Sequence, residues 1–510
     1  MSFNKVPSLS KSRYLSGLQC HLRLWHSCFN RNLASEATPS QQALFDTGHK
    51  VGELATCLFP GGVLIREDHF HHEEAVQSTR NILQDPKVSA IFEAAFLYHD
   101  VRIRADILKR TEGGRWNIIE VKSSTSVKDI HLPDVAIQYY VLKGSGLNIN
   151  RVLLLLINNQ YVYDGNNFDL ENFFSFFDVT DEVHSIQNEI SSRINEQKQM
   201  LSAPDAPVIQ PSRHCNTPFT CEFWEYCTQD MPEHWIFDLY GISQKKFDEL
   251  RGMNVENIKD IPDIFKLTEL QERMKKCVKN NEAFISKKLY ARLKDVEYPV
   301  HFLDFETVNP AIPIYAHTSP YQVIPFQWSD HILYKDGSLE HKEYICDDLR
   351  DPREDFTRTL LNALGEEGSI LIYTTYEKTI IEKLAEHLSQ YHDHLLRIPN
   401  RFKDLCAIIR QYFYHPKFHG SFSLKSVLPV LVPEMKYDTL SIKDGSHASF
   451  EYLRFIDPKT APEEKEKIKE ALLAYCRQDT LAMMKIRDQF IKIEITSQKA
   501  GGPKITHEVK

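Results

Sequence analysis

The first part of the chain alternates between helical and strand-like patterns of apolar residues. Residues 41–58 favour a helix, and three apolar runs come after it. The runs are residues 90–98, 101–108 and 116–122. The letters TEGGR between the second and third runs are typical of a hairpin turn. A helical pattern at 133–143 and a buried strand at 151–157 complete the order helix, three strands, helix, strand, which predicts an α/β domain.

The rest of the chain predicts a connector and a second α/β domain. Residues 184–201 favour a polar helix, which the prolines of SAPDAPVIQPS end. Strands are expected around Phe302, at 323–328, at 332–334 and at SILIY, with helices at 351–366 and 376–390. We therefore predict domains at 1–230 and 298–497, a helical connector at 231–297 and a disordered tail at 498–510.

The strand at 116–122 carries an acid and a base. In a strand, Glu120 and Lys122 share one face, and Asp106 on the preceding strand lies across the hairpin. Two carboxylates can hold Mg²⁺ or Mn²⁺, and such an ion activates water for attack on a phosphodiester. A nearby ammonium group can stabilise the developing charge. A cross-strand ion pair on a solvated face is the alternative, because E-x-K is frequent by chance.

A second acidic set lies in the last region. FLDFET places Asp304 and Glu306 on one strand face, and AYCRQDT places Tyr475 and Asp479 on one face of a helix. Glu377 stands where the strand SILIY leads into the next helix. Each pattern alone is weak, since D-x-E is common on strands and Y-x-x-x-D is usually an exposed pair.

Four of the ten cysteines form a pattern. Cys215, Cys221 and Cys227 are separated by five-residue gaps at the end of the first domain, and Cys20 lies near its start. In a chain without a secretion signal, thiols or metal ligands are expected rather than disulfides. The other six cysteines lack such grouping and are expected to be ordinary buried thiols.

Composition narrows the class of protein. The 510 residues are 42% hydrophobic and 26% charged, as in soluble globular proteins, and the net charge of −9 gives no global basic field. A nuclease remains compatible, because acidic metal sites add negative charge and a groove can be basic locally. The longest aliphatic run, VLLLLI, is too short to span a bilayer, and the start has no apolar signal core. We expect a cytoplasmic protein without a membrane partner.

The first region resembles the PD-(D/E)xK nucleases, which have a restriction-endonuclease-like fold, in its element order and in Asp106, Glu120 and Lys122. Gln138 and Tyr140 resemble the Gln/Tyr motif of the RecB-like branch. The resemblance implies that Asp106 and Glu120 bind metal and that Lys122 and Gln138 take part in catalysis. Further candidates are Glu93, Glu53 or His49, and Tyr140.

The cysteine pattern is similar to that of iron–sulfur RecB/AddB-type nucleases, in which a [4Fe–4S] cluster staples the two ends of the nuclease domain. This resemblance implies four ligands, Cys20, Cys215, Cys221 and Cys227. A structural Zn²⁺ held by the same four thiolates is the alternative.

The last region resembles DEDD exonucleases of the RNase H-like fold, in the tyrosine-type branch. The resemblance implies two metal ions held by Asp304, Glu306 and Asp479, with Tyr475 orienting the water. Glu377 takes the second acidic position, and Asp404 in RFKDLCAII competes for it. The region also resembles a domain often found behind a RecB-like nuclease in bacterial proteins.

The connector resembles a helix–hairpin–helix pair, in which Lys245, Lys246 and Arg251 would contact phosphates, and a plain helical linker is the alternative. Together the resemblances imply a metal-dependent exonuclease with two candidate active sites. It would act on single-stranded DNA or DNA ends, in DNA repair or defence against foreign DNA. One alternative is an RNA-processing 3′–5′ exonuclease with only the C-terminal site live. Another is a non-catalytic scaffold that binds nucleic acid.

Overall fold

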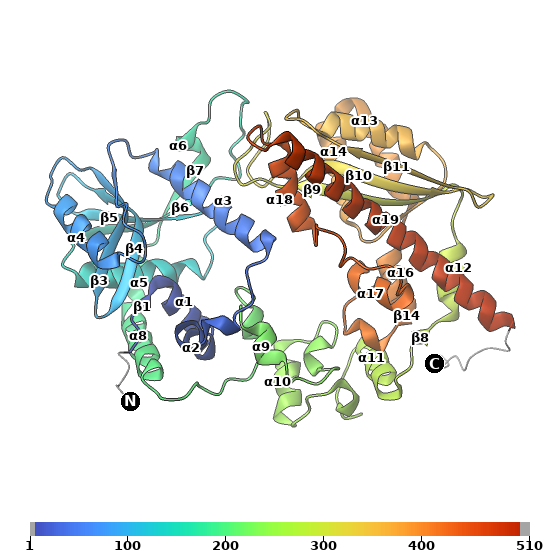
Figure 1. Ribbon diagram of the computed structural model, residues 1–510, viewed down its shortest axis with the longest axis horizontal. Coiled ribbons are helices and arrows are strands. Elements are labelled where there is room, and N and C mark those ends of the chain that lie inside the picture. Colours follow the sequence, from blue (N-terminus) through green and yellow to red (C-terminus); the bar gives the residue numbers. More distant parts are fainter. Residues whose placement is uncertain (1–5, 500–510) are drawn as a thin grey trace. The chain divides into compact units, whose positions relative to one another are not determined.

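The computed structural model describes residues 6–499 and has a mixed α/β fold, which confirms the expected fold class (Figure 1). The chain forms two compact units. The first contains the residues up to Asp230 together with Pro310–Gln322, and the second contains Met231–Asn309 and the residues from Val323 onward. A disordered tail is expected at 498–510, and residues 500–510 of it lie outside the described residues.

A seven-stranded sheet forms the centre of the first unit. Its main order is β2-β3-β4-β5-β6-β7, and β1 pairs with β4. The strands are β1 (Leu9–Ser10), β2 (Val63–Leu64), β3 (Ala90–Tyr98), β4 (Val101–Arg110), β5 (Trp116–Lys122), β6 (Ile149–Ile157) and β7 (Phe174–Asp178). Strands β3, β4 and β5 are antiparallel neighbours, and β6 is parallel to β5. The three strands expected from the apolar runs are therefore confirmed, with β4 two residues longer.

Helix α5 (His131–Gly144) makes the crossover from β5 to β6 and is buried along most of its length. It packs against β3, β4 and β6 on one side and against α1, α7 and α8 on the other. This double packing explains why buried residues lie all round the helix, which has little amphipathic character. The helices of this unit are α1 (Lys11–Gln19), α2 (His21–Phe29), α3 (Pro39–Thr56), α4 (His72–Leu83), α5, α6 (Leu170–Phe173), α7 (Thr180–Ser185), α8 (Gln187–Leu201) and α9 (Trp224–Thr228).

Residues 310–322, which connect two strands of the second unit, pack within the first. Ala311 is buried in a cluster with Ile107, Ile119 and Leu155. The backbone NH of Tyr163 donates to the carbonyl of Thr318 at 3.0 Å, and the Tyr321 hydroxyl donates to the carbonyl of Ser123. The chain thus contributes a segment of its later sequence to its earlier unit.

The second unit contains a five-stranded sheet in the order β11-β10-β9-β12-β13. The strands are β9 (Val300–Val308), β10 (Ile324–Leu333), β11 (Leu339–Ile345), β12 (Ser369–Ile372) and β13 (Phe402–Asp404). The central strand β9 is antiparallel to β10 and parallel to β12. The two strands expected at 323–328 and 332–334 form one continuous strand, which corrects that prediction.

Two layers of helices cover this sheet. Leu303 and Phe305 of β9 pack with Phe356 of α13 (Arg353–Leu364) and Ile380 of α14 (Tyr376–His387). The opposite face, which carries Phe302, Asp304 and Glu306, meets α18 (Gly445–Ile456) and α19 (Pro462–Lys499). Figure 1 shows α19 lying along β9 and β10. Asp304 and Glu306 therefore point toward the helix that carries Tyr475 and Asp479.

The connector region is helical and belongs to the second unit. Its helices are α10 (Gln244–Gly252), α11 (Glu269–Asn280) and α12 (Lys287–Lys294), and β8 (Phe284–Ile285) pairs with β14 (Phe413–Tyr414). The second helical piece of the expected helix–hairpin–helix pair is only a 3₁₀ turn at Ile258–Asp260. The remaining helices of the unit are α15 (His392–Arg397), α16 (Leu405–Tyr412) and α17 (Leu424–Leu431).

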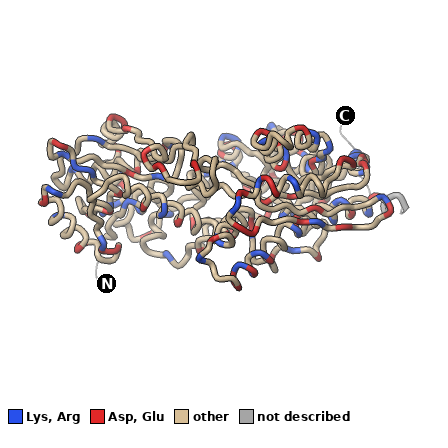
Figure 2. Tube along the Cα trace, turned by 90° about the horizontal axis from the view of Figure 1, so that it is seen from above, with Lys and Arg blue, Asp and Glu red and all other residues tan. Residues whose placement is uncertain are grey.

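Charged residues of both signs are interspersed along the trace of each unit (Figure 2). None of the described helices combines the length and apolar character that crossing a bilayer requires. The long helix α19 illustrates this, because it carries charges along its whole course.

Candidate metal centres

The first candidate centre lies where β4, β5 and α5 meet. Strand pairing continues to Ile107 opposite Ile119, so Asp106 and Glu120 are the next residues across the hairpin. The Oδ2 atom of Asp106 accepts a hydrogen bond from the backbone NH of Val121 at 2.8 Å. The side chain of Glu120 is only 1% exposed. The hairpin register therefore brings both carboxylates together, as the sequence predicts.

Two lysines and two carboxylates form a ring of alternating charge at this centre. Glu120 Oε1 accepts hydrogen bonds from Lys11 Nζ at 2.8 Å and from Lys122 Nζ at 2.7 Å. The second acid is Asp134 on α5, which lies 3.4 Å from Lys11 Nζ through Oδ1 and accepts a hydrogen bond from Lys122 through Oδ2. Each ammonium group thus lies between two carboxylates.

Gln138 closes the centre from the same helix as Asp134. Its Nε2 atom donates to Glu120 Oε2 at 2.6 Å, and the residue is fully buried. Its Oε1 atom is buried without a hydrogen-bond partner. A buried acceptor of this kind costs free energy unless a donor such as a bound water satisfies it. The side chain therefore suits a site that also holds a hydrated cation.

Burial and neighbouring charges give the two carboxylates of this centre different pKa values. Burial, aided by the charge of Glu120, raises the pKa of Asp106 to about 7. Burial alone would also raise the pKa of Glu120, but the ammonium groups of Lys11 and Lys122 hold it well below its usual range. Glu120 is therefore ionised at neutral pH, while Asp106 gains or loses its proton near neutrality.

The remaining candidates of the first unit are Glu93, Glu53, His49 and Tyr140, and they have different surroundings. Glu93 has a left-handed φ of 54° in β3, forms an ion pair with Arg104 at 3.2 Å, and is close enough for its charge to raise the pKa of Asp106. Glu53 and His49 are exposed on α3. The ring of Tyr140 packs against Tyr98, and its hydroxyl group shares a hydrogen bond of 3.1 Å with His99. Glu93 thus borders the centre, whereas Tyr140 belongs to an aromatic group at the β3–β4 turn.

The second candidate centre lies between β9, α14 and α19. Asp304, Glu306 and Cys476 each offer a ligand atom, and these atoms all lie within 4.8 Å of one another. The Cys476 thiol is fully buried and lies 3.5 Å from Asp304 Oδ2. The fold therefore brings Asp304 and Glu306 of β9 next to the turn of α19 that contains Tyr475 and Cys476.

Asp479, one helical turn after Tyr475, is held by a residue from another segment. The hydroxyl group of Tyr437 donates a hydrogen bond to Asp479 Oδ1. The ammonium group of Lys425 lies 5.5 Å from the ring centre of Tyr437 and 5.3 Å from that of Tyr475. Its charge lowers the pKa values of Glu306 and Asp479, although burial raises both on balance. Lys425 is thus a partly exposed cation beside two of the carboxylates.

Glu377 and Asp404 compete for the second acidic position of this pattern. Glu377 is the second residue of α14, is 3% exposed, and has a buried Oε2 atom without a hydrogen-bond partner. Its charge raises the pKa of both Asp304 and Glu306. Asp404 instead caps α16, where its side chain accepts from the backbone NH of Ala407 at 2.7 Å. Glu377 therefore lies close to Asp304 and Glu306. Asp404 lies close enough to Glu377 for its charge to raise the pKa of that residue.

The four carboxylates of the second centre repel one another. Burial, followed by the charges of Asp479, Glu306 and Glu377, raises the pKa of Asp304 well above its usual range. Burial and the charge of Asp404 raise the pKa of Glu377 to about 8, and burial raises the pKa of Asp479 to about 6. Lys425 brings one positive charge to four carboxylates, and divalent cations would supply the rest.

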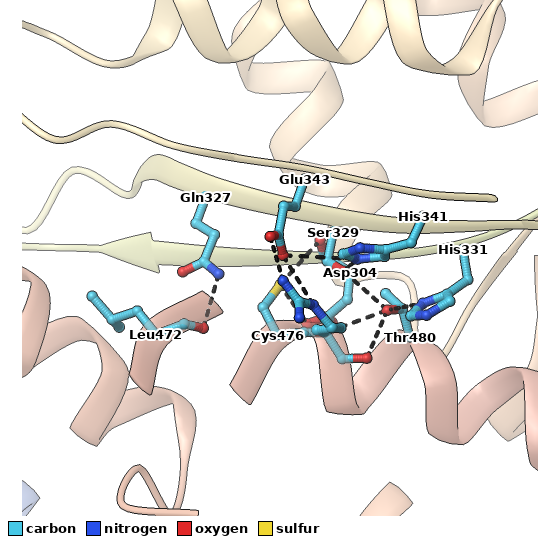
Figure 3. A network of polar contacts seen from close by, with 10 residues as sticks. Asp304, Gln327, Ser329, His331, His341, Glu343, Leu472, Cys476 and Thr480 are labelled. Carbon is cyan, nitrogen blue, oxygen red and sulfur yellow. Dashed lines mark hydrogen bonds and ion pairs between the residues drawn. The ribbon is translucent and has the colours of Figure 1, made fainter. Parts of the chain in front are cut away.

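A polar network fixes the register of α19 against the sheet (Figure 3). Ser329 and His331 of β10 share hydrogen bonds of 3.0 and 2.8 Å with the hydroxyl group of Thr480. Ser329 also lies 3.0 Å from His341 Nε2, and Gln327 Nε2 donates to the carbonyl of Leu472 at 2.9 Å. These contacts lie on the same sheet face as Asp304, so they hold Cys476 and Asp479 in place.

Sequence reasoning missed four residues of these centres. Lys11 is 109 positions before Glu120 and has no local signal. Asp134 precedes Gln138 by four positions, so the helical spacing could have found it. Cys476 follows Tyr475 directly, and its role depends on the facing strand. Tyr437 lies in a segment without a recognisable pattern.

The four predicted cysteines line one small cavity at the end of the first unit. Cys20, Cys215, Cys221 and Cys227 share it with Phe223 and His214. Burial raises the pKa of the Cys221 thiol to about 12 and that of Cys227 to about 11. Thiols with such pKa values bind metal only if the metal displaces their protons. The residues therefore converge, and their donor set fits a thiolate-bound metal group.

Comparison with protein families gives one match. The family model for a domain of unknown function, DUF2779, matches residues 301–423. The matched stretch contains Asp304, Glu306, Glu377 and Asp404 and ends before Tyr437, and the description carries no activity. The comparison with curated proteins gives no match.

Proposed function

We propose that the protein is a metal-dependent nuclease that hydrolyses phosphodiester bonds of DNA at two separate centres. The observation that carries the proposal is the meeting of Asp304 and Glu306 of β9 with Cys476 of α19, where the charges of Glu377 and Asp479 are close enough to raise the pKa of Asp304. Four neighbouring carboxylates without a matching set of cations are costly unless divalent ions neutralise them. The resemblance to DEDD exonucleases gives this arrangement a reaction class.

At the second centre, Asp304, Glu306 and Asp479 would hold Mg²⁺ or Mn²⁺, which supply Lewis acidity and an activated water when bound. Tyr437 keeps Asp479 in position through its hydrogen bond. Tyr475 is 4% exposed beside these carboxylates, where its hydroxyl group can orient a water molecule. Lys425 adds a positive charge at the edge of the centre, where the phosphate of a substrate strand would enter.

At the first centre, Asp106 and Glu120 would hold one divalent ion of the same kind. Gln138 orients Glu120 by donating to its Oε2 atom. Lys122 lies 2.7 Å from Glu120 Oε1, so its ammonium group is next to the position where charge develops on a phosphate. The arrangement agrees with the roles that the PD-(D/E)xK resemblance implies for these residues.

The four cysteines of the cavity would supply the thiolates for a [4Fe–4S] cluster, as the resemblance implies, and a structural Zn²⁺ is the alternative. Tetrahedral zinc with Zn–S bonds of about 2.3 Å requires sulfur atoms about 3.8 Å apart. Within residues 6–499, no three of the cysteine sulfurs all lie within 4.8 Å of one another. The thiols are therefore not already spaced for tetrahedral zinc.

The test is a cleavage assay with end-labelled single- and double-stranded DNA and RNA in Mg²⁺ or Mn²⁺. The purified chain should degrade DNA, and EDTA should stop it. Lys122→Ala and Asp479→Ala should each remove one activity, and the double variant should remove both. Absence of cleavage of every polymer by the wild-type chain overturns the proposal.

The same assay separates the RNA alternative. The ion-pair ring around Glu120 favours that alternative, because Lys11 and Lys122 both occupy Oε1 of Glu120 and leave this atom without room for a metal ion. An RNA-processing exonuclease with only the second centre live would degrade RNA from the 3′ end. It would lose all activity in Asp479→Ala and none in Lys122→Ala.

A further inference from the structure

Lys11 reaches the first centre from a distant part of the chain. It is the first residue of α1, directly after the N-cap Ser10, and α1 packs against α5 and β4. Its ammonium group lies 2.8 Å from Glu120 Oε1 and 3.4 Å from Asp134 Oδ1. The side chain is 25% exposed. Lys11 therefore contacts the centre and has access to solvent.

Glu120 has little capacity left for a metal ion in this state. A carboxylate offers about four lone-pair sites on its two oxygens. Lys11 and Lys122 occupy Oε1, and Gln138 occupies one site of Oε2. A divalent ion that binds Glu120 through Oε1 must therefore take the place of one ammonium group.

Lys11 makes one hydrogen bond at this centre, whereas Lys122 makes two. Lys122 comes from the same strand as Glu120 and also donates a hydrogen bond to Asp134. The contact of Lys11 with Asp134 is the longer one, at 3.4 Å, and this pair makes no hydrogen bond. When Glu120 is taken by another cation, Lys122 keeps a hydrogen bond to Asp134, whereas Lys11 keeps only the ion pair with the same residue.

Charge balance gives the released lysine a partner. The ring itself is neutral, since Lys11 and Lys122 oppose Glu120 and Asp134. When a divalent ion binds, its charge exceeds that of ionised Asp106 by one, so the centre is left with a single positive charge. One phosphodiester group carries one negative charge and would neutralise it. Without Lys11, the loaded centre would already be neutral.

From these contacts we infer that Lys11 is a second active-site lysine, which exchanges Glu120 for a phosphate of the substrate backbone when the centre takes a divalent ion. The inference rests on the proposed function for its substrate class. It assigns Lys11 two opposite effects, because the side chain competes with the metal ion and attracts the nucleic acid. A lysine with a purely structural role would have neither.

The first experiment measures metal binding without any cleavage. The full-length chain carries Asp304→Asn and Asp479→Asn, so that Mn²⁺ binding reports on the first centre. Titration followed by electron paramagnetic resonance compares Lys11→Met with the exposed control Lys128→Met. Removal of a cation about 3 Å from Glu120 should tighten Mn²⁺ binding about tenfold or more, and the control should match the parent.

The second experiment measures binding of a phosphorothioate single strand in saturating Mn²⁺, because this backbone keeps its charge and resists hydrolysis. Lys11→Met should bind more weakly than Lys128→Met. The slope of log affinity against log salt should shrink by about 0.7, the value for one lost phosphate contact. Lys11→Arg keeps the charge and should retain most of the strand affinity, which also controls for folding.

The two results together decide the inference. Tighter Mn²⁺ binding with a reduced salt slope supports it. Mn²⁺ binding that is unchanged or weaker in Lys11→Met overturns it, and so does an unchanged salt slope. The proposed function fails separately, because a chain that cleaves no nucleic acid can still show or lack the change in Mn²⁺ affinity.

Discussion

The hydroxyl group of Tyr437 donates a hydrogen bond to Oδ1 of Asp479, which lies 42 positions later in the chain. Asp479 belongs to α19, whereas Tyr437 lies between α17 and α18. The contact helps to orient a carboxylate that lies close to Asp304 and Glu306. Residues that orient a metal-binding carboxylate in this way affect metal affinity and activity without touching the metal.

Tyr437→Phe should therefore weaken the second centre while preserving its fold. We expect the Mn²⁺ concentration for half-maximal cleavage to rise, or the rate to fall, by about 10–100-fold. Tyr334→Phe serves as the control, since its hydroxyl group bonds to exposed Glu340 at the β10–β11 turn. Equal activity of the two variants over a full metal titration would contradict the role of Tyr437.

The raised pKa of Glu377 predicts how stability depends on pH. Burial and Asp404 raise this pKa to about 8 in the folded chain, against about 4.3 for an unfolded glutamate. Between these values the folded chain binds more protons than the unfolded one, so this group makes stability fall as pH rises from about 4 to about 8. In EDTA, Glu377→Gln should match the wild-type Tm at pH 5 and exceed it at pH 8.5, on the order of 5 °C.

Calorimetry at several pH values checks this, because comparison with the variant cancels the contributions of other groups. The difference in Tm should shrink again when Mn²⁺ is added at pH 8.5, since bound cations relieve the repulsion. A Tm difference that is constant from pH 5 to pH 8.5 would show that ionisation of Glu377 does not destabilise the folded chain.

Thr480 tests whether the network in Figure 3 stabilises the second unit. Thr480→Val removes the hydroxyl group that contacts both Ser329 and His331 and leaves buried polar atoms with fewer partners. We expect a loss of about 1–3 kcal/mol in the free energy of unfolding. Thr480→Ser keeps the hydroxyl group and should lose less in the same urea titration. An unchanged free energy of unfolding in Thr480→Val would contradict a stabilising role for the hydroxyl group.

The cysteine cavity predicts a coloured protein. Anaerobically purified chain should absorb in the visible range and contain iron, and Cys221→Ser should lose both. Cys57→Ser, which changes an exposed thiol at the end of α3, should keep them. A colourless wild-type protein that contains zinc and no iron would replace the cluster with a zinc site.

Local patterns predicted the elements whose side chains alternate regularly. The apolar runs of β3, β4 and β5 each lie in one strand, and the turn residues between β4 and β5 set their register. This register alone was enough to bring Asp106 and Glu120 together. The same holds for Asp304 and Glu306, because neighbouring positions i and i+2 always share a strand face.

The sequence misled where burial of polar residues depends on a distant partner. Ser329, Asp330 and His331 appeared to interrupt a strand, yet all three are buried in the middle of β10. Ser329 and His331 bond to Thr480 of α19, and Asp330 lies 2.7 Å from His301 Nδ1 of β9. The sequence analysis missed Lys11 and Tyr437 for the same reason, because only the folded chain brings them next to Glu120 and Asp479.

The placement of Pro310–Gln322 in the first unit has a practical consequence for dissecting the protein. A truncated polypeptide that starts at Met231 would retain β9 and all four acids of the second centre. It would also retain Ala311 and Tyr321 without Ile107, Leu155 and Ser123, their packing and hydrogen-bond partners. Replacing residues 310–322 with a short polar linker should make the excised second unit easier to produce in solution.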